Sequence, residues 1–267
     1  MHPIERLRSV ARAQGAGPSI LVGEAAAALA GFGNEPAGLV TACRRLVDRH
    51  PAVGPMWALA ARVLNAPDPV DEAWRVADEV DADPTPALLA AALPEEATVL
   101  VLGWPEQAAQ ALYRRGDVQV LLVGSAGEGR GLSQRLGRAG VTCADVPDAG
   151  LAAAVGECDL VVLEAFAIGP TGFLAAAGSQ AAALVARAVD VPVWVVAGEG
   201  RALPEPLWKA LCDRIRRSTD EPWYRPHDIV PLAPCAEVFG PTGRQGAAEA
   251  ANRADCATAP ELLKPPA

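Results

Sequence analysis

Positive charge is scarce in this 267-residue sequence. Asp and Glu outnumber Lys and Arg by 32 to 23, which gives a net charge of −9, and Lys209 and Lys264 are the only lysines. Nucleic acids and anionic membrane surfaces attract proteins mainly through positive charge. The charge balance therefore argues against non-specific binding to either, and we expect no nucleic acid and no membrane among the partners.

Long apolar runs are missing too. No apolar stretch approaches the ~18 residues that a membrane-spanning helix needs, and no signal-peptide pattern opens the chain. Hydrophobic residues nevertheless make up 51% of the sequence, which is enough to build a sizeable core in one or two domains. We expect a soluble, cytoplasmic protein.

Residue types that hold metals, cofactors and nucleophiles are few and scattered. The six cysteines form no C-x-x-C pair and lie at no ligand spacing from a histidine, so we expect buried, reduced thiols and no metal site. The glycine-rich stretch Gly124–Gly131 fits neither the dinucleotide-binding nor the P-loop pattern, and no cofactor is expected. No Ser/His/Asp relay is evident.

Two kinds of pattern divide the chain. Residues 1–93 place apolar positions at i, i+3 and i+4 between Gly and Pro breaks, which predicts an N-terminal helical domain. Residues 94–240 alternate β-type runs with helical segments, which is typical of a Rossmann-like α/β domain with a parallel sheet. Residues 241–267 are turn-rich and are expected to form a C-terminal tail on the surface or on a partner. The predicted strands are Thr98–Leu102, Val118–Val123, Val141–Val146, Asp159–Leu163 and Val191–Val196.

The stretch Cys158–Gly198 carries this alternation most clearly. Its two apolar runs flank an Ala-rich helical segment that starts near Gly178, which predicts a βαβ crossover with parallel strands. Ligands bind beyond the carboxyl ends of such strands, so the connection Glu164–Gly178, interpreted as a Gly/Pro-broken loop, is where chemistry is expected. Asp228–Leu232 and Glu237–Phe239 are predicted as returning strands at the sheet edge.

The segment from Asp159 to Ala197, with Thr98-Val99-Leu100, Glu128–Leu132 and Val238–Pro241, resembles the initiation factor 2B-related family. This family contains the alpha, beta and delta subunits of eukaryotic translation initiation factor 2B, methylthioribose-1-phosphate isomerase and ribose-1,5-bisphosphate isomerase. The resemblance implies a helical domain followed by a NagB/RpiA/CoA transferase-like α/β domain. It also implies a homodimer formed through the α/β domain.

The residues that the resemblance would make catalytic are replaced. The isomerases of the family use a Cys after the first strand and an Asp at the end of the fourth, because proton transfer between neighbouring carbons needs an acid and a base. Here those positions are Gly103 and Ala165, the latter beside Glu164. The family's Asn-Lys, Ser-Arg-Pro and Arg-Gly-Ala motifs fall on Ala175-Ala176, Ser125-Ala126-Gly127 and Val22-Gly23-Glu24. Most cations that a phosphate requires are therefore missing, which indicates a retained fold and a lost or replaced activity.

A few residues remain as candidates for a site. Glu164 is either a displaced general base, with Thr171 as the accompanying hydroxyl, or a carboxylate that pairs with an Arg or reaches solvent at the strand end. Arg130 starts a helix and is either an anion ligand or a residue of a salt bridge or an interface. The ring of Trp104 either closes the family's sugar pocket or stacks on a ligand, and Ser179 is expected to cap the helix that follows it. The ligand-binding candidates are Gly23, Gly103, Trp104, Arg130, Glu164, Thr171, Gly172 and Ser179.

Three hypotheses follow. The first is a non-catalytic binding or regulatory homologue of the sugar-phosphate isomerases, a homodimer that binds a small phosphorylated ligand such as a sugar phosphate or a nucleotide. The alternative is an aldose–ketose isomerase with a rearranged site built on Glu164 and Thr171. A translation factor proper rests only on the family name, and fold does not imply function. We also predict that no cysteine lies within reach of Glu164 and Arg130.

Overall fold

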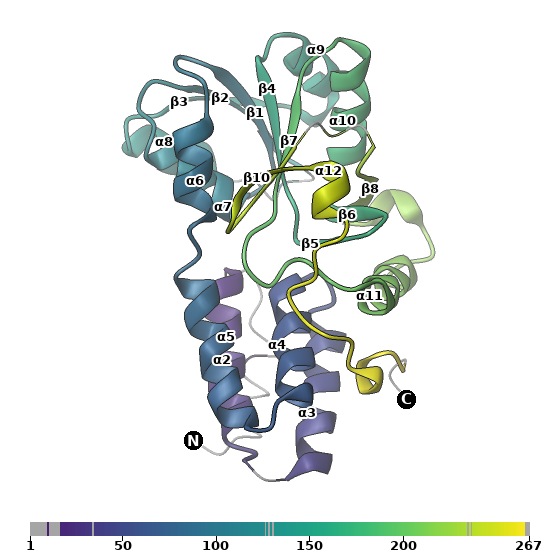
Figure 1. Ribbon diagram of the computed structural model, residues 1–267. Coiled ribbons are helices and arrows are strands. Elements are labelled where there is room, and N and C mark those ends of the chain that lie inside the picture. The colour runs from purple at the N-terminus through teal and green to yellow at the C-terminus, as the bar shows by residue number, and fades with distance from the viewer. Residues whose placement is uncertain are drawn as a thin grey trace.

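The computed structural model describes residue 10 and residues 17–33, 35–125, 127, 129, 131–233, 235 and 237–264. Its N-terminal part consists of helices that share one core, below the sheet in Figure 1. Each of these helices has a proline in its first turn, where the missing N–H has no intrahelical acceptor to lose. They are α2 (Pro18–Ala30), α3 (Pro36–Arg49), α4 (Gly54–Asn65) and α5 (Pro69–Asp81). The predicted helical N-terminal part is confirmed.

The second part is built on a seven-stranded sheet with the strand order β10-β9-β7-β4-β1-β2-β3. Every neighbouring pair is parallel except the antiparallel pair β9–β10. The strands are β1 (Thr98–Leu102), β2 (Gln119–Val123), β3 (Thr142–Val146), β4 (Leu160–Glu164), β7 (Val193–Val196), β9 (Glu237–Gly240) and β10 (Gly243–Gly246). The α/β class, the five predicted strands and the parallel pairing of β4 with β7 are confirmed.

Helices cover both faces of the sheet, because successive residues of a strand point to opposite sides. In β1, Val99 and Val101 enter one core with α6, α7 and α8, whereas Leu100 and Leu102 enter another with α9 and α10. These helices are α6 (Thr85–Ala92), α7 (Glu106–Tyr113), α8 (Leu132–Arg138), α9 (Leu151–Gly156) and α10 (Ser179–Ala188). No described helix is long and apolar enough to cross a bilayer. The predicted domain boundaries stay predictions, and α6 packs on the sheet although it precedes residue 93.

The connection after β4 is a β-hairpin, so its interpretation as a loop was wrong. Strands β5 (Ala167–Gly169) and β6 (Gly172–Ala176) pair with each other, and β8 (His227–Pro231) adds to β6 to complete a small antiparallel sheet. A side chain at Gly172 would overlap the carbonyl oxygen of Val230, so this close pairing requires glycine. Of the two strands expected at the sheet edge, β9 lies in the main sheet beside β7, and β8 lies in the small one.

The C-terminal region is not a surface tail, contrary to expectation. Strand β10 joins the main sheet, and Ala259 and Leu262 are 0% exposed because they enter the helical core. Arg214, on α11 (Glu205–Arg217), fixes this region: it donates to the carbonyl oxygen of Leu262 at 3.1 Å and pairs with Asp48 of α3 at 2.8 Å. These contacts join the last residues to both α3 and α11.

Candidate ligand-binding site

Glu164, the last residue of β4, is 6% exposed, and both of its carboxylate oxygens are occupied. One oxygen accepts hydrogen bonds from the backbone N–H groups of Gln107 at 2.8 Å and Ala108 at 3.1 Å, in the first turn of α7. Negative charge is favoured there, because the free N–H groups of a helix start carry partial positive charge. The other oxygen accepts from Nη1 of Arg201 at 3.0 Å. The carboxylate is therefore enclosed by groups of the protein itself.

Arg201, which the sequence did not suggest, completes this arrangement. It is 2% exposed, follows β7, and donates from Nη1 to the carbonyl oxygen of Ala165 at 2.6 Å as well as to Glu164. Its backbone is held by the hairpin, because the N–H of Ile168 donates to the carbonyl oxygen of Arg201 at 2.8 Å. The partners are 37 residues apart in sequence, so no local pattern announces the pair.

A second set of hydrogen bonds extends from α7 to the loop after β7. The side-chain amide of Gln107 donates to Asp83 and accepts from the N–H of Gly198 at 3.1 Å. Asp83 in turn accepts from the N–H groups of Thr85 at 2.9 Å and Glu199 at 2.8 Å. The carboxyl ends of β4 and β7 are thus closed by internal hydrogen bonds, and we call this the closed network (Asp83, Gln107, Glu164, Glu199 and Arg201).

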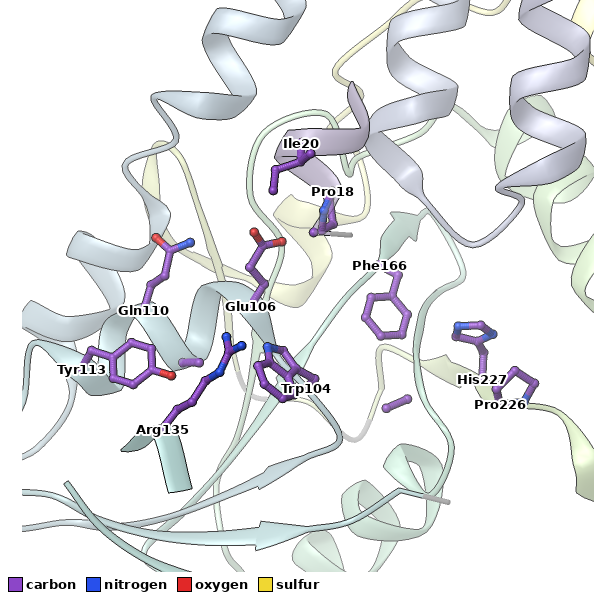
Figure 2. Close-up of a pocket in the computed structure, with 13 residues that line it drawn as sticks. Pro18, Ile20, Trp104, Glu106, Gln110, Tyr113, Arg135, Phe166, Pro226 and His227 are labelled. Carbon is purple, nitrogen blue, oxygen red and sulfur yellow. The ribbon is translucent and has the colours of Figure 1, made fainter. Parts of the chain in front are cut away.

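An open cavity lies beside the closed network, and Figure 2 shows the residues around it. Its volume is about 650 Å³, within the range of roughly 300–1,000 Å³ typical of small-molecule sites. Trp104, just beyond β1, Tyr113 of α7 and Phe166, just beyond β4, give it aromatic walls. The start of α2 contributes Pro18 and Ile20, and Ile20 is 64% exposed. The cavity therefore lies between the helical part and the strand ends.

Two basic side chains that line the cavity, Arg135 and His227, differ in charge. The guanidinium carbon of Arg135 lies 4.8 Å from the centroid of the Trp104 ring, a cation–π contact. His227 meets Phe166 edge-on, with ring centroids 5.3 Å apart. Burial lowers the pKa of His227 to about 4, so its imidazole is neutral at pH 7.

Glu106, the first residue of α7, brings a carboxylate to the same cavity. Partial burial raises the pKa of Glu106, the charge of Glu164 raises it further, and Arg201 opposes the shift. An added Cβ at Gly17 would lie 2.6 Å from its Oε1, so the chain before α2 passes close to this carboxylate. Neither Glu106 nor Arg135 was among the candidates from sequence, because both fall within ordinary helical patterns.

Of the predicted site residues, Trp104 lines the cavity, whereas Gly23, Gly103 and Gly172 do not. Gly103 has a φ of +65°, and its carbonyl oxygen would lie 2.9 Å from a Cβ at Gly129, so the loop after β2 packs directly on it. Gly23 is in α2, and nothing lies within 4 Å of an added Cβ. Gly103 and Gly172 therefore serve the fold, whereas no described contact requires a glycine at position 23.

The structure does not bring Thr171 to Glu164. Thr171 lies at the turn of the β5–β6 hairpin, where its hydroxyl accepts a hydrogen bond from the Trp208 indole N–H at 2.9 Å. Strand β6 separates this turn from Ala176, which lines the cavity. The five residue steps from Thr171 to Ala176 span about 16 Å along the strand, too far for Thr171 to act with a group at the cavity.

Ser179 does not cap α10, so that expectation was wrong. The N-cap is Gly178, with a φ of +92°, and no side chain of the cap residue bonds to the helix. Asp228 of β8 takes this role by accepting from the N–H groups of Gly178 at 2.9 Å and Gln180 at 3.0 Å. Arg130, the remaining candidate, lies outside the described residues.

The cysteines are separate from this region. All six are free, and none lines the cavity or bonds to Glu164 in the described part of the chain. Burial raises the pKa of Cys43 to about 12 and that of Cys143 to about 11, which disfavours the reactive thiolate. Among the described residues, no group of three or more His, Cys, Asp or Glu side chains could hold a metal ion.

Comparison with known proteins gives a family match and several similar structures. Residues 90–208 match the model of the Initiation factor 2 subunit family, and no curated protein matches the chain. A translation initiation factor eIF-2B from Pyrococcus horikoshii OT3 is similar in structure, with a TM-score of 0.76 at 15% identity over 91% of this chain and 96% of that one. The predicted resemblance to the initiation factor 2B-related family is thereby confirmed.

Two further solved structures are similar to this chain in fold. A chain of the tetrameric eIF2B-beta2-delta2 complex from C. thermophilum has a TM-score of 0.75 at 17% identity, over 93% of this chain and 92% of that one. A 5-methylthioribose 1-phosphate isomerase from Pyrococcus horikoshii OT3 has a TM-score of 0.65 at 18% identity, over 93% and 86%. Since the same fold serves translation factors and an isomerase, the role of this chain depends on its own residues.

Proposed function

We propose that this protein is a non-catalytic homologue of the family's isomerases that binds a small molecule in the open cavity. The observation that carries the proposal is the state of Glu164. A general base must be free to reach the proton that it removes. Both oxygens of Glu164 are instead bonded to Arg201 and to α7, inside the protein.

The neighbouring positions support the same proposal. Gly103 and Ala165, at the positions where the family resemblance implies a Cys and an Asp, have no side chain that exchanges a proton. Thr171 is held at the far end of the hairpin by Trp208. The open cavity lies at the carboxyl ends of the strands, where ligands bind in α/β proteins.

An isomerase assay tests the absence of catalysis. Purified protein is incubated with methylthioribose 1-phosphate and, separately, ribose 1,5-bisphosphate, with a competent isomerase of the family as the positive control. We expect no ketose product above background. Turnover above about 0.1 per second, within a decade or two of an ordinary enzyme, would overturn the proposal in favour of a rearranged active site.

We also propose a homodimer formed through the α/β domain. The support is the family resemblance, and one of the similar structures comes from a tetrameric complex. Light scattering at micromolar concentration should give twice the 27.5 kDa of a single chain. A single-chain mass at every concentration tested would contradict this part of the proposal.

A further inference from the structure

Glu106 carries a polar group of the cavity that has no partner among the described residues. No hydrogen bond or ion pair joins its carboxylate to another residue in the described part of the chain. Glu164, whose carboxylate lies at the start of the same helix, accepts three hydrogen bonds. A half-buried carboxylate without a partner costs free energy, and a donor or cation from a ligand would remove that cost.

The surroundings of Glu106 favour a cation. A smaller cavity of about 220 Å³ shares Pro18, Glu106 and Gln110 with the open one. Its other walls include Asp81, Asp83 and Glu199, whereas its one described cation, Arg201, is already paired with Glu164. The side of the open cavity next to Glu106 is therefore negative, which attracts an ammonium group and repels a phosphate.

The rest of the cavity favours a flat ring. Trp104, Tyr113 and Phe166 line it, and Figure 2 shows their rings around the same space as Glu106. Aromatic faces stack on flat rings and attract cations. Arg135 already lies over Trp104, so its positive charge occupies the tryptophan side. A ligand's own cation is best placed at Glu106, the carboxylate that lines the same cavity.

We propose that the open cavity binds an aromatic amine, a small flat ring that carries an alkylammonium group. The ring lies against Trp104 and Phe166, and the ammonium donates to Glu106. At Glu106 a sugar phosphate is a poorer ligand, because its dianion would meet the carboxylate. This inference rests on the proposed function and specifies the ligand class for the same cavity.

Three probes with one ring and three charges test the inference on the unaltered protein. Calorimetry compares tryptamine (a cation), 3-methylindole (neutral) and indole-3-propionate (an anion). Since a hydrogen bond to a charged group changes affinity about tenfold to hundredfold, we expect tryptamine to bind at least tenfold more tightly than indole-3-propionate. Equal or tighter binding of the anion would overturn the proposal.

A matched pair of variants assigns the preference to Glu106. Glu106→Gln keeps the shape and removes the charge, so the affinity for tryptamine should fall about tenfold or more while that for 3-methylindole stays unchanged. Glu205→Gln is the control, since Glu205 also follows a proline as the first residue of a helix but is exposed and away from the cavity. Equal tryptamine affinity in the two variants would overturn the assignment.

Failure of the aromatic-amine proposal can be distinguished from failure of the proposed function. The aromatic-amine proposal is wrong if no probe binds. It is also wrong if methylthioribose 1-phosphate displaces tryptamine at a concentration below the one at which tryptamine saturates the protein. The proposed function then still stands or falls with the isomerase assay, which does not depend on these probes.

Discussion

Two carboxylates at the start of one helix have opposite surroundings. Glu164 reaches the first turn of α7 from β4 and is enclosed by two backbone N–H groups and Arg201. Glu106 is the first residue of that helix, faces a cavity of about 650 Å³, and has no partner among the described residues. The difference shows that a carboxylate at the carboxyl ends of the strands is not by that position alone available to a ligand. A carboxylate with every bond filled stabilises the fold, and one with none filled is available to a ligand.

The closed network and the open cavity differ in the same way as Glu164 and Glu106. The closed network links the helical connection at Asp83 to α7 and to the loop after β7. The open cavity has aromatic walls, and the carboxylate of Glu106 in it has no partner among the described residues. We therefore expect mutations in the closed network to change stability, and mutations in the cavity to change binding.

The largest expected effect comes from opening the closed network. Glu164→Ala leaves the guanidinium of Arg201 buried without a counter-charge and removes the acceptor for the first turn of α7. Losing one partner of a buried pair costs about 3–5 kcal/mol, so urea unfolding should show a loss of this size. Glu157→Ala, an exposed glutamate just before β4, should stay within about 0.5 kcal/mol of wild type. A loss below about 1 kcal/mol for Glu164→Ala would mean that the network is not closed.

Alanine substitutions at two glycines that were predicted to bind a ligand should change the free energy of unfolding in opposite directions, again measured by urea unfolding. Gly172→Ala forces a methyl group against the carbonyl of Val230, which should cost about 1–3 kcal/mol, as overpacking does. Gly23→Ala adds a methyl to a helix with open space around it, and should stabilise by about 0.5–1 kcal/mol. If both variants lost stability equally, the structural difference assigned to these positions would be wrong.

Acid should weaken the protein partly through His227. The pKa of His227 is about 4 in the folded protein against 6.5 for an unperturbed histidine, so the unfolded chain binds the proton more readily. The stability contributed by neutral His227 is present above pH 6.5 and is lost as the pH falls from 6.5 to 4. Discounted for partial exposure, this amounts to about 1–2 kcal/mol.

The difference between wild type and His227→Phe isolates this contribution. The comparison is needed because burial raises the pKa of Glu106, Glu199 and Asp255, and a raised carboxyl pKa acts in the opposite direction. Thermal unfolding from pH 7 to pH 4 should show a smaller decline for the variant. Parallel declines would show that His227 is accessible to protons in the folded state.

The smallest expected effect sharpens the contrast between the two carboxylates. Glu106→Gln removes a charge that has no partner, so stability at pH 7 should be unchanged or higher by up to about 0.5 kcal/mol. Glu164→Gln should instead lower it by more than about 1.5 kcal/mol, because a charged hydrogen-bond acceptor is lost. Urea unfolding of both variants, measured together, gives this comparison directly. Equal losses would mean that Glu106 has a partner in solution.

The main sheet could be predicted from sequence because its strands are apolar runs bounded by turns. In β1, alternate residues fill the cores on the two faces, and both faces are buried. Strand β6 was missed because its sequence, Gly-Phe-Leu-Ala-Ala, has weak strand preference, and pairing with β5 and β8 decides its conformation. The region after Gly240 was missed because contacts distant in sequence place it: Arg44 of α3 donates to the carbonyl oxygen of Glu261, 217 residues away, and Leu262 enters the helical core.

The candidate site was less predictable than the fold. The position of Glu164 at the end of β4 follows from the strand pattern, and its pairing with an arginine was one of three interpretations, beside a general base and a solvent-exposed carboxylate. Arg201 and Asp228 reach their partners from segments 37 and about 50 residues away, so local patterns such as N-caps cannot reveal them. Glu106 was overlooked because an acidic residue in the first helical turn is ordinary.

Carbodiimide labelling of the native protein with an amine nucleophile, followed by tryptic peptide mapping, tests the central claim most directly. Arg114 and Arg138 lie between Glu106 and Glu164, so the two carboxylates fall in different peptides. We predict that Glu106 is labelled in the native protein and that Glu164 is labelled only after unfolding in urea. Labelling of Glu164 in the native protein as fast as Glu106 would contradict the account, because it would show a free carboxylate where the structure has a closed one.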